Sequence, residues 1–289
     1  MIFSSLRDFL NRGTALLAKG PVAMIFCEDT VEINSTVQHH LGLGFASVIV
    51  ILPDAFEIPG RLEGEATWLR HNTTAAGALE QVVNAIAAVA PPATWLYYCY
   101  NAEYLFFPFC ENRSVGEMLA FHAEERRDAM LAYVIDIYSG DLDRFPDAVD
   151  PKGAMLDRSG YYALGRKDRE TGQERERQLD FFGGLRWRFE EHVPKHRRKI
   201  DRIALFRPQA GLMLRDDHTF NVEEYNTYAC PWHHNITSAI VSFRTAKALR
   251  TNPGSRYDVH SFVWHSSVPF EWHSQQLMDL GLMEPGQWF

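Results

Sequence analysis

Two short apolar segments, separated by a stretch with helical periodicity, constrain the fold of this chain more than any other feature. The first is "VAMIF" at 22–26, and the second, at 45–54, is "FASVIVILPD". Between them, apolar residues recur at helical spacing from Val31 to Leu43, and Gly42 and Gly44 mark the end of that helix. Strands without polar alternation are typical of a parallel sheet that is covered on both faces. The segment therefore predicts a strand–helix–strand unit.

The same alternation continues along the chain. The pattern predicts a strand within 65–71, a helix over 75–90, a strand within 91–100, a helix over 114–127 and a strand over 129–141. Further on it predicts a solvated loop over 141–178, two strands with a turn over 179–214 and a helix over 236–251. Alternating strands and helices indicate an α/β fold, a Rossmann-type open mixed sheet flanked by helices. An irregular C-terminal extension follows.

Three parts are expected along the chain. Residues 1–20 form an amphipathic helix, which we expect to pack on its own domain, with peripheral membrane contact as the alternative. Residues 21–250 form the main domain, with halves of about 21–140 and 141–250. Residues 251–289 are rich in aromatic side chains and are expected to pack on the body as a C-terminal tail.

Composition narrows the class of protein. The 289 residues are 46% hydrophobic with a formal net charge of −8, which argues against a general nucleic-acid binder. The four cysteines are widely spaced without a CxxC pair, so we expect them to be reduced. The sequence shows no signal peptide and no run of about 20 apolar residues. We therefore expect a cytoplasmic protein, with the inner face of the membrane as an alternative location.

Polar residues interrupt the apolar run "WLYYCYNAEYLFFPF" at its centre. Neither GxGxxG nor GxxxxGK[ST] is present, so a nucleotide site would need another way to hold phosphates, such as a divalent cation on acidic or amide oxygens. On an extended strand, Asn101 and Glu103 would point to the same side and converge on one ion. The alternative is an edge strand that tolerates two polar residues. With Glu28 and Asp54 they are predicted to gather at the carboxyl edge of the sheet, where ligands bind.

These motifs resemble family 2-like glycosyltransferases of the GT-A fold. In "VAMIFCEDTVEINSTVQHHLGLGFASVIVI" the residues that match the family pattern are Glu28, His40, Gly44 and Phe45. "WLYYCYNAEYLFFP" is similar to the family's D-x-D-E-F segment, with Asn101 where an aspartate is usual. Downstream, His218 and either His233 or His234 match histidine positions of the family, so the resemblance covers roughly residues 20–250.

The resemblance implies a hexosyltransferase that moves a sugar from a nucleotide-diphosphate donor, most commonly a UDP-sugar, to a glycan or lipid-linked acceptor in polysaccharide biosynthesis. It implies donor contacts from Glu28, Asp54, Asn101 and Glu103. It also implies a divalent cation, Mn²⁺ or Mg²⁺, held by Glu103 with His233 and His234. The amide of Asn101 lowers the charge offered to a metal, so metal-independent transfer is the alternative.

An inverting transferase also needs a carboxylate that accepts the proton of the acceptor hydroxyl. Asp180 in "LDFFGG" is the first candidate and Glu190 the second, while Arg186 and Arg188 could steady the departing diphosphate. The alternative for the carboxylates is that they are ordinary surface residues near "RWR". Two other functions remain open: a GT-like module that binds carbohydrate or protein without catalysis, and a nucleotidyltransferase.

Overall fold

The computed structural model describes residues 1–168, 170–227 and 235–288, and the chain divides into two compact units. Unit 1 comprises Met1–Leu105, Asn112–Leu131 and Ile203–Asn226. Unit 2 comprises Phe106–Glu111, Ala132–Arg202 and Thr227–Phe289. The strands that contribute residues to both units are β6 (Glu103–Phe106), β7 (Ala129–Ser139) and β11 (Asp201–Phe206). The chain is an α/β protein with a large mixed sheet flanked by helices, which confirms the predicted class.

Unit 1 is built on a parallel sheet. Its five parallel strands are β1 (Ile2–Phe3), β2 (Val22–Phe26), β3 (Ser47–Leu52), β4 (Thr67–Arg70) and β5 (Leu96–Tyr100). Their order is β1-β4-β3-β2-β5, and the end of β11 pairs with β5 in the antiparallel sense. Strand β2 is buried at all five positions, as its wholly apolar sequence predicts.

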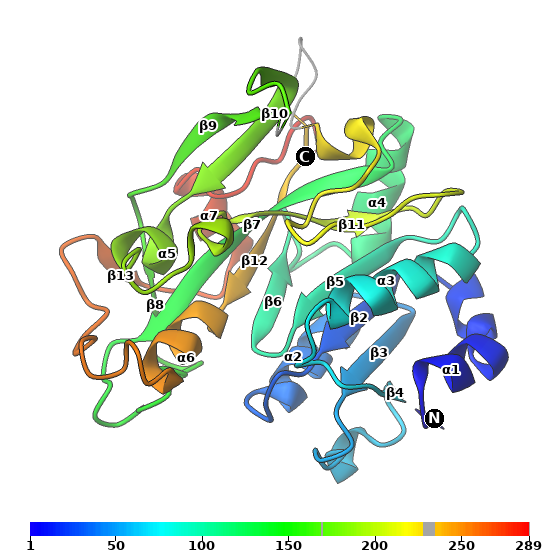
Figure 1. Ribbon diagram of the computed structural model, residues 1–289, viewed down its shortest axis with the longest axis horizontal. Helices are drawn as coiled ribbons and strands as arrows, with labels where there is room; N and C mark the ends of the chain where they lie inside the picture. The colour runs from blue at the N-terminus through cyan, green and yellow to red at the C-terminus, as the bar shows by residue number, and fades with distance from the viewer. Residues whose placement is uncertain (169, 228–234, 289) are drawn as a thin grey trace. The chain divides into compact units, whose positions relative to one another are not determined.

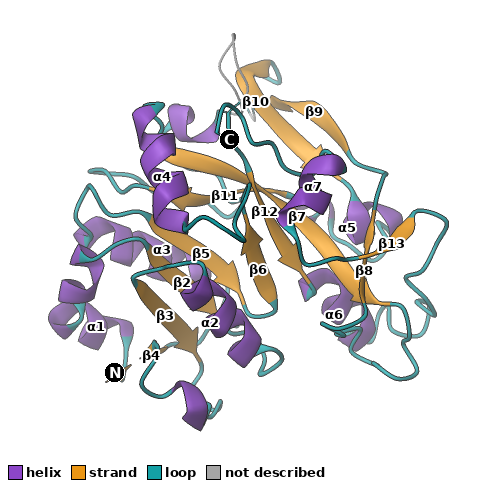
Figure 2. Cartoon of the chain, turned by 180° about the vertical axis from the view of Figure 1, so that it is seen from behind, coloured by secondary structure: helices purple, strands orange, loops and turns teal. Residues whose placement is uncertain are grey.

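Helices cover both faces of this sheet. They are α1 (Leu6–Arg12), α2 (Ile33–Gly42), α3 (Ala78–Val89) and α4 (Val115–Glu124). Helices α1 and α3 contact one another on one face, whereas α2 and α4 lie on the other (Figures 1 and 2). Ser114 caps α4 in a capping box with Glu117. The predicted alternation of strands and helices up to residue 139 is therefore confirmed.

The N-terminal segment differs from the single helix predicted over 1–20. It contains β1, the short helix α1 and the 3₁₀ turn η1 (Thr14–Ala18). Helix α1 ends at Arg12 with Gly13 as its C-cap, a position that requires glycine because a Cβ there would lie 2.6 Å from the ring of Phe9. Phe3, Phe9 and Leu17 are buried. The apolar stripe therefore packs within unit 1, the first of the two alternatives.

Unit 1 buries neutral histidines, which makes its stability sensitive to acid. Burial lowers the pKa of His40 to about 3 and that of His122 to about 4. His122 bonds through Nε2 to the Ala129 carbonyl at 2.8 Å, and its Nδ1 has no partner among the described residues. The unfolded state of such a histidine binds a proton below pH 6.5, while the folded state does not. Stability contributed by these groups is therefore present at neutral pH and lost as the pH falls.

We expect His122→Gln to remove the part of this acid-dependent loss of stability that His122 causes. Glutamine keeps a donor for the Ala129 carbonyl but does not titrate. Between pH 7 and pH 6 the free energy of unfolding of the original chain should fall by roughly 0.7 kcal/mol more than that of the variant. Urea unfolding at the two pH values measures this difference. Equal losses in the two proteins would show that His122 titrates normally.

Unit 2 contains mostly antiparallel strands. Its own strands are β8 (Ala154–Asp157), β9 (Tyr162–Lys167), β10 (Glu174–Phe182), β12 (Ser238–Ser242) and β13 (Ser267–Pro269). Strand β12 pairs in parallel with β7, β8 is antiparallel to β7 and β13, and β9 pairs with β10. Its helices are α5 (Gly184–Arg188), α6 (Arg244–Thr251) and α7 (Ser274–Asp279). The remaining short turns of the chain are η2 (Gly60–Leu62), η3 (Lys195–Arg197) and η4 (Glu223–Asn226).

Two predictions for this unit are wrong. The expected loop over 141–178 contains β8, β9 and the start of β10. The β9–β10 hairpin carries charged residues on both faces, so it lacks the alternation that reveals a half-buried strand. The segment expected as one helix over 236–251 begins with β12, because its five residues are fully buried beside β7. The helix starts only at Arg244.

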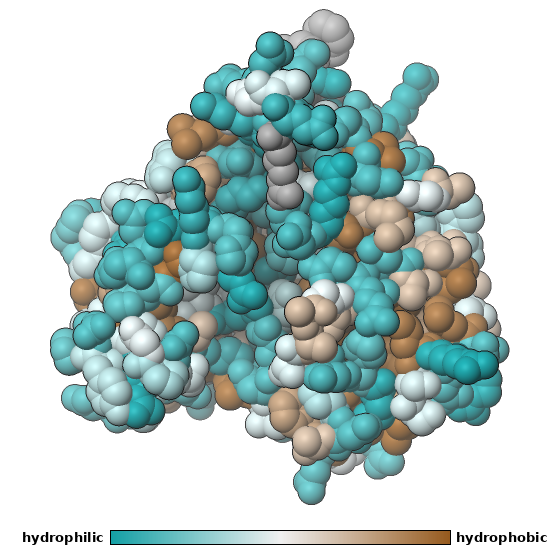
Figure 3. Space-filling view, in the orientation of Figure 1, coloured by the Kyte–Doolittle hydropathy of each residue, from teal (hydrophilic) through white to brown (hydrophobic). Residues whose placement is uncertain are grey.

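On the face shown in Figure 3, small hydrophobic areas lie between hydrophilic residues. Among the described residues, no helix is both long and apolar enough to span a membrane. Aromatic residues of the C-terminal segment, including Phe262, Phe270 and Trp288, are buried.

Candidate functional site

The carboxyl ends of β2, β3 and β5 bring polar residues to one edge of the unit 1 sheet. Cys27, Glu28 and Asp29 follow β2, Asp54 follows β3, and Asn101 follows β5 directly. Because β2 pairs in parallel with both β3 and β5, these ends lie side by side. Asp54 is exposed and Glu28 is half-buried. The edge thus presents carboxylates to solvent where open α/β sheets bind ligands.

Asn101 organises the loop that follows β2. Its Oδ1 accepts the backbone N–H of Glu28 at 2.9 Å. Its Nδ2 donates to Asp29 Oδ1 at 2.6 Å and to the Val31 carbonyl at 2.8 Å. Only an amide can make all three bonds together, since a carboxylate could accept the first but has no donor for the last two. With a residue exposure of 1%, Asn101 is a structural clamp between β5 and the β2–α2 loop.

The expected geometry of Asn101 and Glu103 is wrong. The two residues do not lie on one extended strand, because β5 ends at Tyr100 and Ala102 adopts a left-handed φ of 59°. The turn is held by a 2.9 Å bond from the Ala102 N–H to Thr36 Oγ1. Glu103 is fully buried, and its Oε2 accepts the Tyr100 N–H at 2.8 Å. Their oxygens are therefore engaged inside the protein.

These contacts do not fit a divalent cation at the predicted position. A metal there would have to displace the bonds that hold the Asn101–Ala102 turn. His233 and His234, the other predicted metal ligands, lie outside the described residues. Within 1–168, 170–227 and 235–288, no three His, Cys, Asp or Glu side chains form a group suited to a metal. His218, a further match to the family, stacks on Tyr98 at a ring distance of 5.8 Å.

Asp180 and Glu190, the predicted catalytic bases, are engaged in ion pairs of unit 2. Asp180 lies on β10, and its Oδ1 accepts from Arg166 Nε at 2.7 Å and from Lys199 Nζ at 3.3 Å. Glu190 is exposed beyond α5 and pairs with Arg198 at 2.6 Å. The described contacts favour the alternative reading of these two residues as ion-paired carboxylates.

Arg186 and Arg188 each lie beside a buried aspartate that the sequence prediction missed. Arg188 makes two 3.1 Å contacts with the two oxygens of Asp157 and donates to the Phe262 carbonyl at 2.7 Å. Asp157 also accepts from Trp264 Nε1 at 2.7 Å and from the Tyr138 hydroxyl. Because the guanidinium already has these partners, Arg188 has little capacity left for a diphosphate.

The second arginine lies beside a carboxylate without a hydrogen bond. Arg186 donates to the Lys199 carbonyl at 2.6 Å and to Thr245 Oγ1 at 3.2 Å, and its Nε is 3.7 Å from Asp136 Oδ1. The Thr245 hydroxyl and the backbone N–H of Arg186 also face Asp136. Both lower its pKa, but neither reaches hydrogen-bond geometry. Burial nevertheless raises the pKa of Asp136. An aspartate in the apolar run "AYVIDIY" was the available signal.

The sequence of the chain matches no model of a known protein family, and no curated protein matches it at a significant level.

Proposed function

We propose that the chain is a glycosyltransferase of the GT-A type whose unit 1 binds a nucleotide-diphosphate sugar, with a UDP-sugar as the first candidate. One observation carries the proposal: Glu28, Asp54 and the loop held by Asn101 meet at the carboxyl edge of a parallel sheet. Ligands of open α/β sheets bind at such an edge. The motif resemblance supports the same class of donor.

In this proposal Asn101 does not contact a metal. It shapes the β2–α2 loop, while Glu28 and Asp54 supply the polar contacts to the donor. Glu103 stays inside the turn, so we propose that donor binding is metal-independent. In the transfer, the bond between the anomeric carbon and the diphosphate breaks as the acceptor oxygen attacks from the opposite side. The acceptor proton passes to a carboxylate, and a nucleoside diphosphate leaves.

Thermal unfolding with UDP and a panel of UDP-hexoses, with and without Mn²⁺, tests the donor site. A ligand present at 100 times its Kd should add about 2.7 kcal/mol to the free energy of unfolding, in metal-free buffer as well. Glu28→Ala and Asp54→Ala should each weaken binding about tenfold, since each removes a carboxylate contact. Glu63→Ala is the matched control, because this exposed glutamate precedes β4 at the opposite end of the strands. If no nucleotide raises the melting temperature, the proposal is wrong.

A second candidate is a GT-like module that binds without catalysis. The observation that favours it is the internal use of Asn101 and Glu103, which leaves neither side chain for the reaction. Release of UDP from a UDP-hexose, measured by chromatography, separates the candidates. Release at a rate above the protein-free background supports the transferase. Binding without release supports the module.

A further inference from the structure

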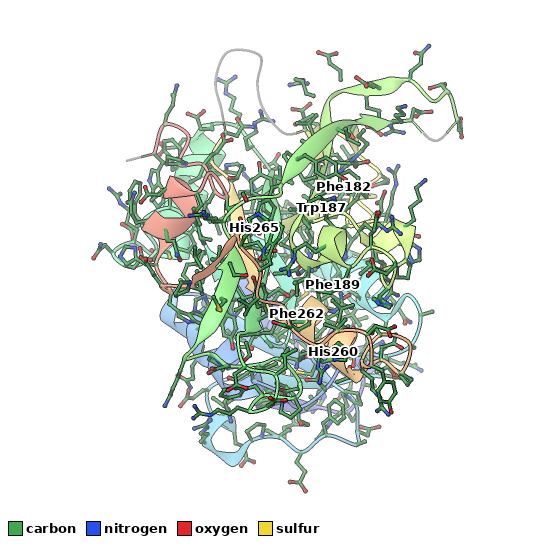
Figure 4. The ribbon with its side chains drawn as sticks, turned by 90° about the vertical axis from the view of Figure 1, so that its left-hand side faces the viewer. Phe182, Trp187, Phe189, His260, Phe262 and His265 are labelled. Carbon is green, nitrogen blue, oxygen red and sulfur yellow. The ribbon has the colours of Figure 1, made fainter. Side chains whose placement is uncertain are left out.

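Unit 2 carries exposed aromatic side chains close to its buried ion pairs. Trp187 on α5 has an exposed fraction of 40%, and its ring centre is 6.3 Å from that of Trp264 in an edge-on arrangement. Trp264 in turn lies 4.5 Å from the ring of His265. Figure 4 labels Trp187 and His265, the two residues whose rings lie against that of Trp264. Exposed aromatic groups of this kind often mark binding surfaces.

Two glycines allow aromatic rings to pack directly against the backbone. A Cβ at Gly160 would lie 3.1 Å from the ring of Trp187 and 3.7 Å from that of Trp264. A Cβ at Gly183, where φ is +154°, would lie 2.2 Å from the ring of Tyr161. Both positions therefore require glycine. The arrangement of the three rings depends on close contacts that a side chain at either glycine would disrupt.

The ring of Trp264 is held in a fixed orientation. Its Nε1 donates to Asp157 at 2.7 Å, and the Arg188 guanidinium lies 4.5 Å from the ring centre. A buried ion pair such as Arg188–Asp157 adds little net stability, because desolvation of the charges offsets their attraction. Here the pair has a further effect, since it sets the position of an aromatic ring beside Trp187.

Two buried polar groups pack against the glycines at the start of α5 and have unused hydrogen-bonding capacity. Asp136 is 1% exposed, and both its carboxylate oxygens lack a hydrogen bond among the described residues. The Tyr161 hydroxyl is likewise closed to solvent and unpartnered there. Tyr161 packs against Gly183, and Asp136 Oδ2 is 3.1 Å from the Cβ position of Gly184. Buried polar atoms are usually hydrogen-bonded, so these groups can accept a further partner.

We propose that Trp187, Tyr161 and Asp136 belong to a saccharide-binding site of unit 2. The apolar C–H face of a pyranose stacks on Trp187, and a sugar hydroxyl bonds to the Tyr161 hydroxyl and to Asp136 once the Tyr161 side chain shifts. A hydroxyl group suits both, because it donates to a carboxylate and accepts from a phenol. Sites of this type combine aromatic walls with a few placed polar groups. The binding is independent of the donor site, and only the description of the saccharide as the acceptor rests on the proposed function.

The test measures binding of cellohexaose, chitohexaose, maltohexaose and mannohexaose to the full chain without nucleotide, by saturation-transfer NMR and calorimetry. At least one should bind with a Kd of about 1 mM or tighter. Trp187→Ala should weaken that binding at least about tenfold by removing the stacking surface. Tyr161→Phe should weaken it about fivefold, although it removes a hydroxyl that supports no described contact and should not lower the melting temperature.

Tyr257→Ala is the matched control. Tyr257 is an exposed aromatic residue of unit 2 that stacks with Arg256 at 4.4 Å, so its loss should leave saccharide binding unchanged. The proposal is overturned if none of the four saccharides binds, or if both Trp187→Ala and Tyr161→Phe bind as the original chain does. UDP-sugar binding is measured separately, so an original chain that binds a nucleotide but none of the four saccharides would reject this site alone.

Discussion

Asn101→Asp should destabilise the protein by about 3 kcal/mol at pH 7 and should not create a metal site. The amide donates to Asp29 at 2.6 Å and to the Val31 carbonyl at 2.8 Å. A carboxylate at position 101 would set acceptor against acceptor at both contacts, with like charges at the first. Urea unfolding measures the loss. It should shrink at pH 4, because protonation of one carboxyl group restores a donor.

Asp29→Asn supplies the matched rescue. In the double variant the new amide at 29 can donate to the carboxylate at 101 when its nitrogen takes the place of Oδ1. That same atom accepts the Val31 N–H at 2.9 Å in the original chain, so this bond is lost. We expect less than half of the lost stability to return, since the Val31 carbonyl remains without its donor and the Val31 N–H loses its acceptor. Titration of Asn101→Asp with Mn²⁺ provides the opposing outcome. Specific stabilisation of this variant by the ion would show that Asn101 occupies a degraded metal position after all.

Asp157→Ala should have the largest effect in unit 2, a loss of about 3 to 5 kcal/mol. Asp157 accepts from Arg188, Trp264 and Tyr138, so its removal leaves a buried guanidinium without a counter-charge. Tryptophan fluorescence during urea unfolding reports the change, because Trp187 and Trp264 belong to this unit. A loss below about 1 kcal/mol would mean that the cluster is solvated in solution.

Asp136→Asn is the contrasting control, and its expected effect has the opposite sign. Burial raises the pKa of Asp136, so the charged carboxylate is disfavoured in the folded state. Stability linked to this group is therefore highest at low pH and decreases as the pH rises from the unfolded pKa towards the raised one. The amide avoids that cost, while Arg186 keeps its bonds to Lys199 and Thr245. At pH 7 the variant should be as stable as the original chain or more stable.

Much of unit 1 could be predicted because local and tertiary preferences agree there. Apolar runs became β2, β3 and β5, and the periodic segments became α2, α3 and α4. Unit 2 was harder for a physical reason. The β9–β10 hairpin has polar residues on both faces, and β12 has an apolar sequence that suits a buried strand as well as a helix.

The candidate site was predicted in position but not in chemistry. The prediction that Glu28, Asp54 and Asn101 follow neighbouring strands came from the order of elements, and pairing of β2 with β3 and β5 confirms it. The predicted metal geometry assumed that the strand continues through residue 103. The left-handed conformation of Ala102 ends the strand. The letters N-A-E do not predict this conformation, since alanine rarely adopts a positive φ.

The sequence by itself determined the α/β class, the edge of the sheet at which the polar residues gather and the order of strands and helices in unit 1, because hydrophobic periodicity is a local property. Only the tertiary structure decided the use of each polar group. Asn101 became a clamp because the β2–α2 loop offers one acceptor from Asp29 and one from Val31. Asp157 accepts three hydrogen bonds because Arg188, Trp264 and Tyr138 reach it from three segments that are distant in the sequence. Hydrogen bonds of this kind depend on distances that the order of residues does not contain.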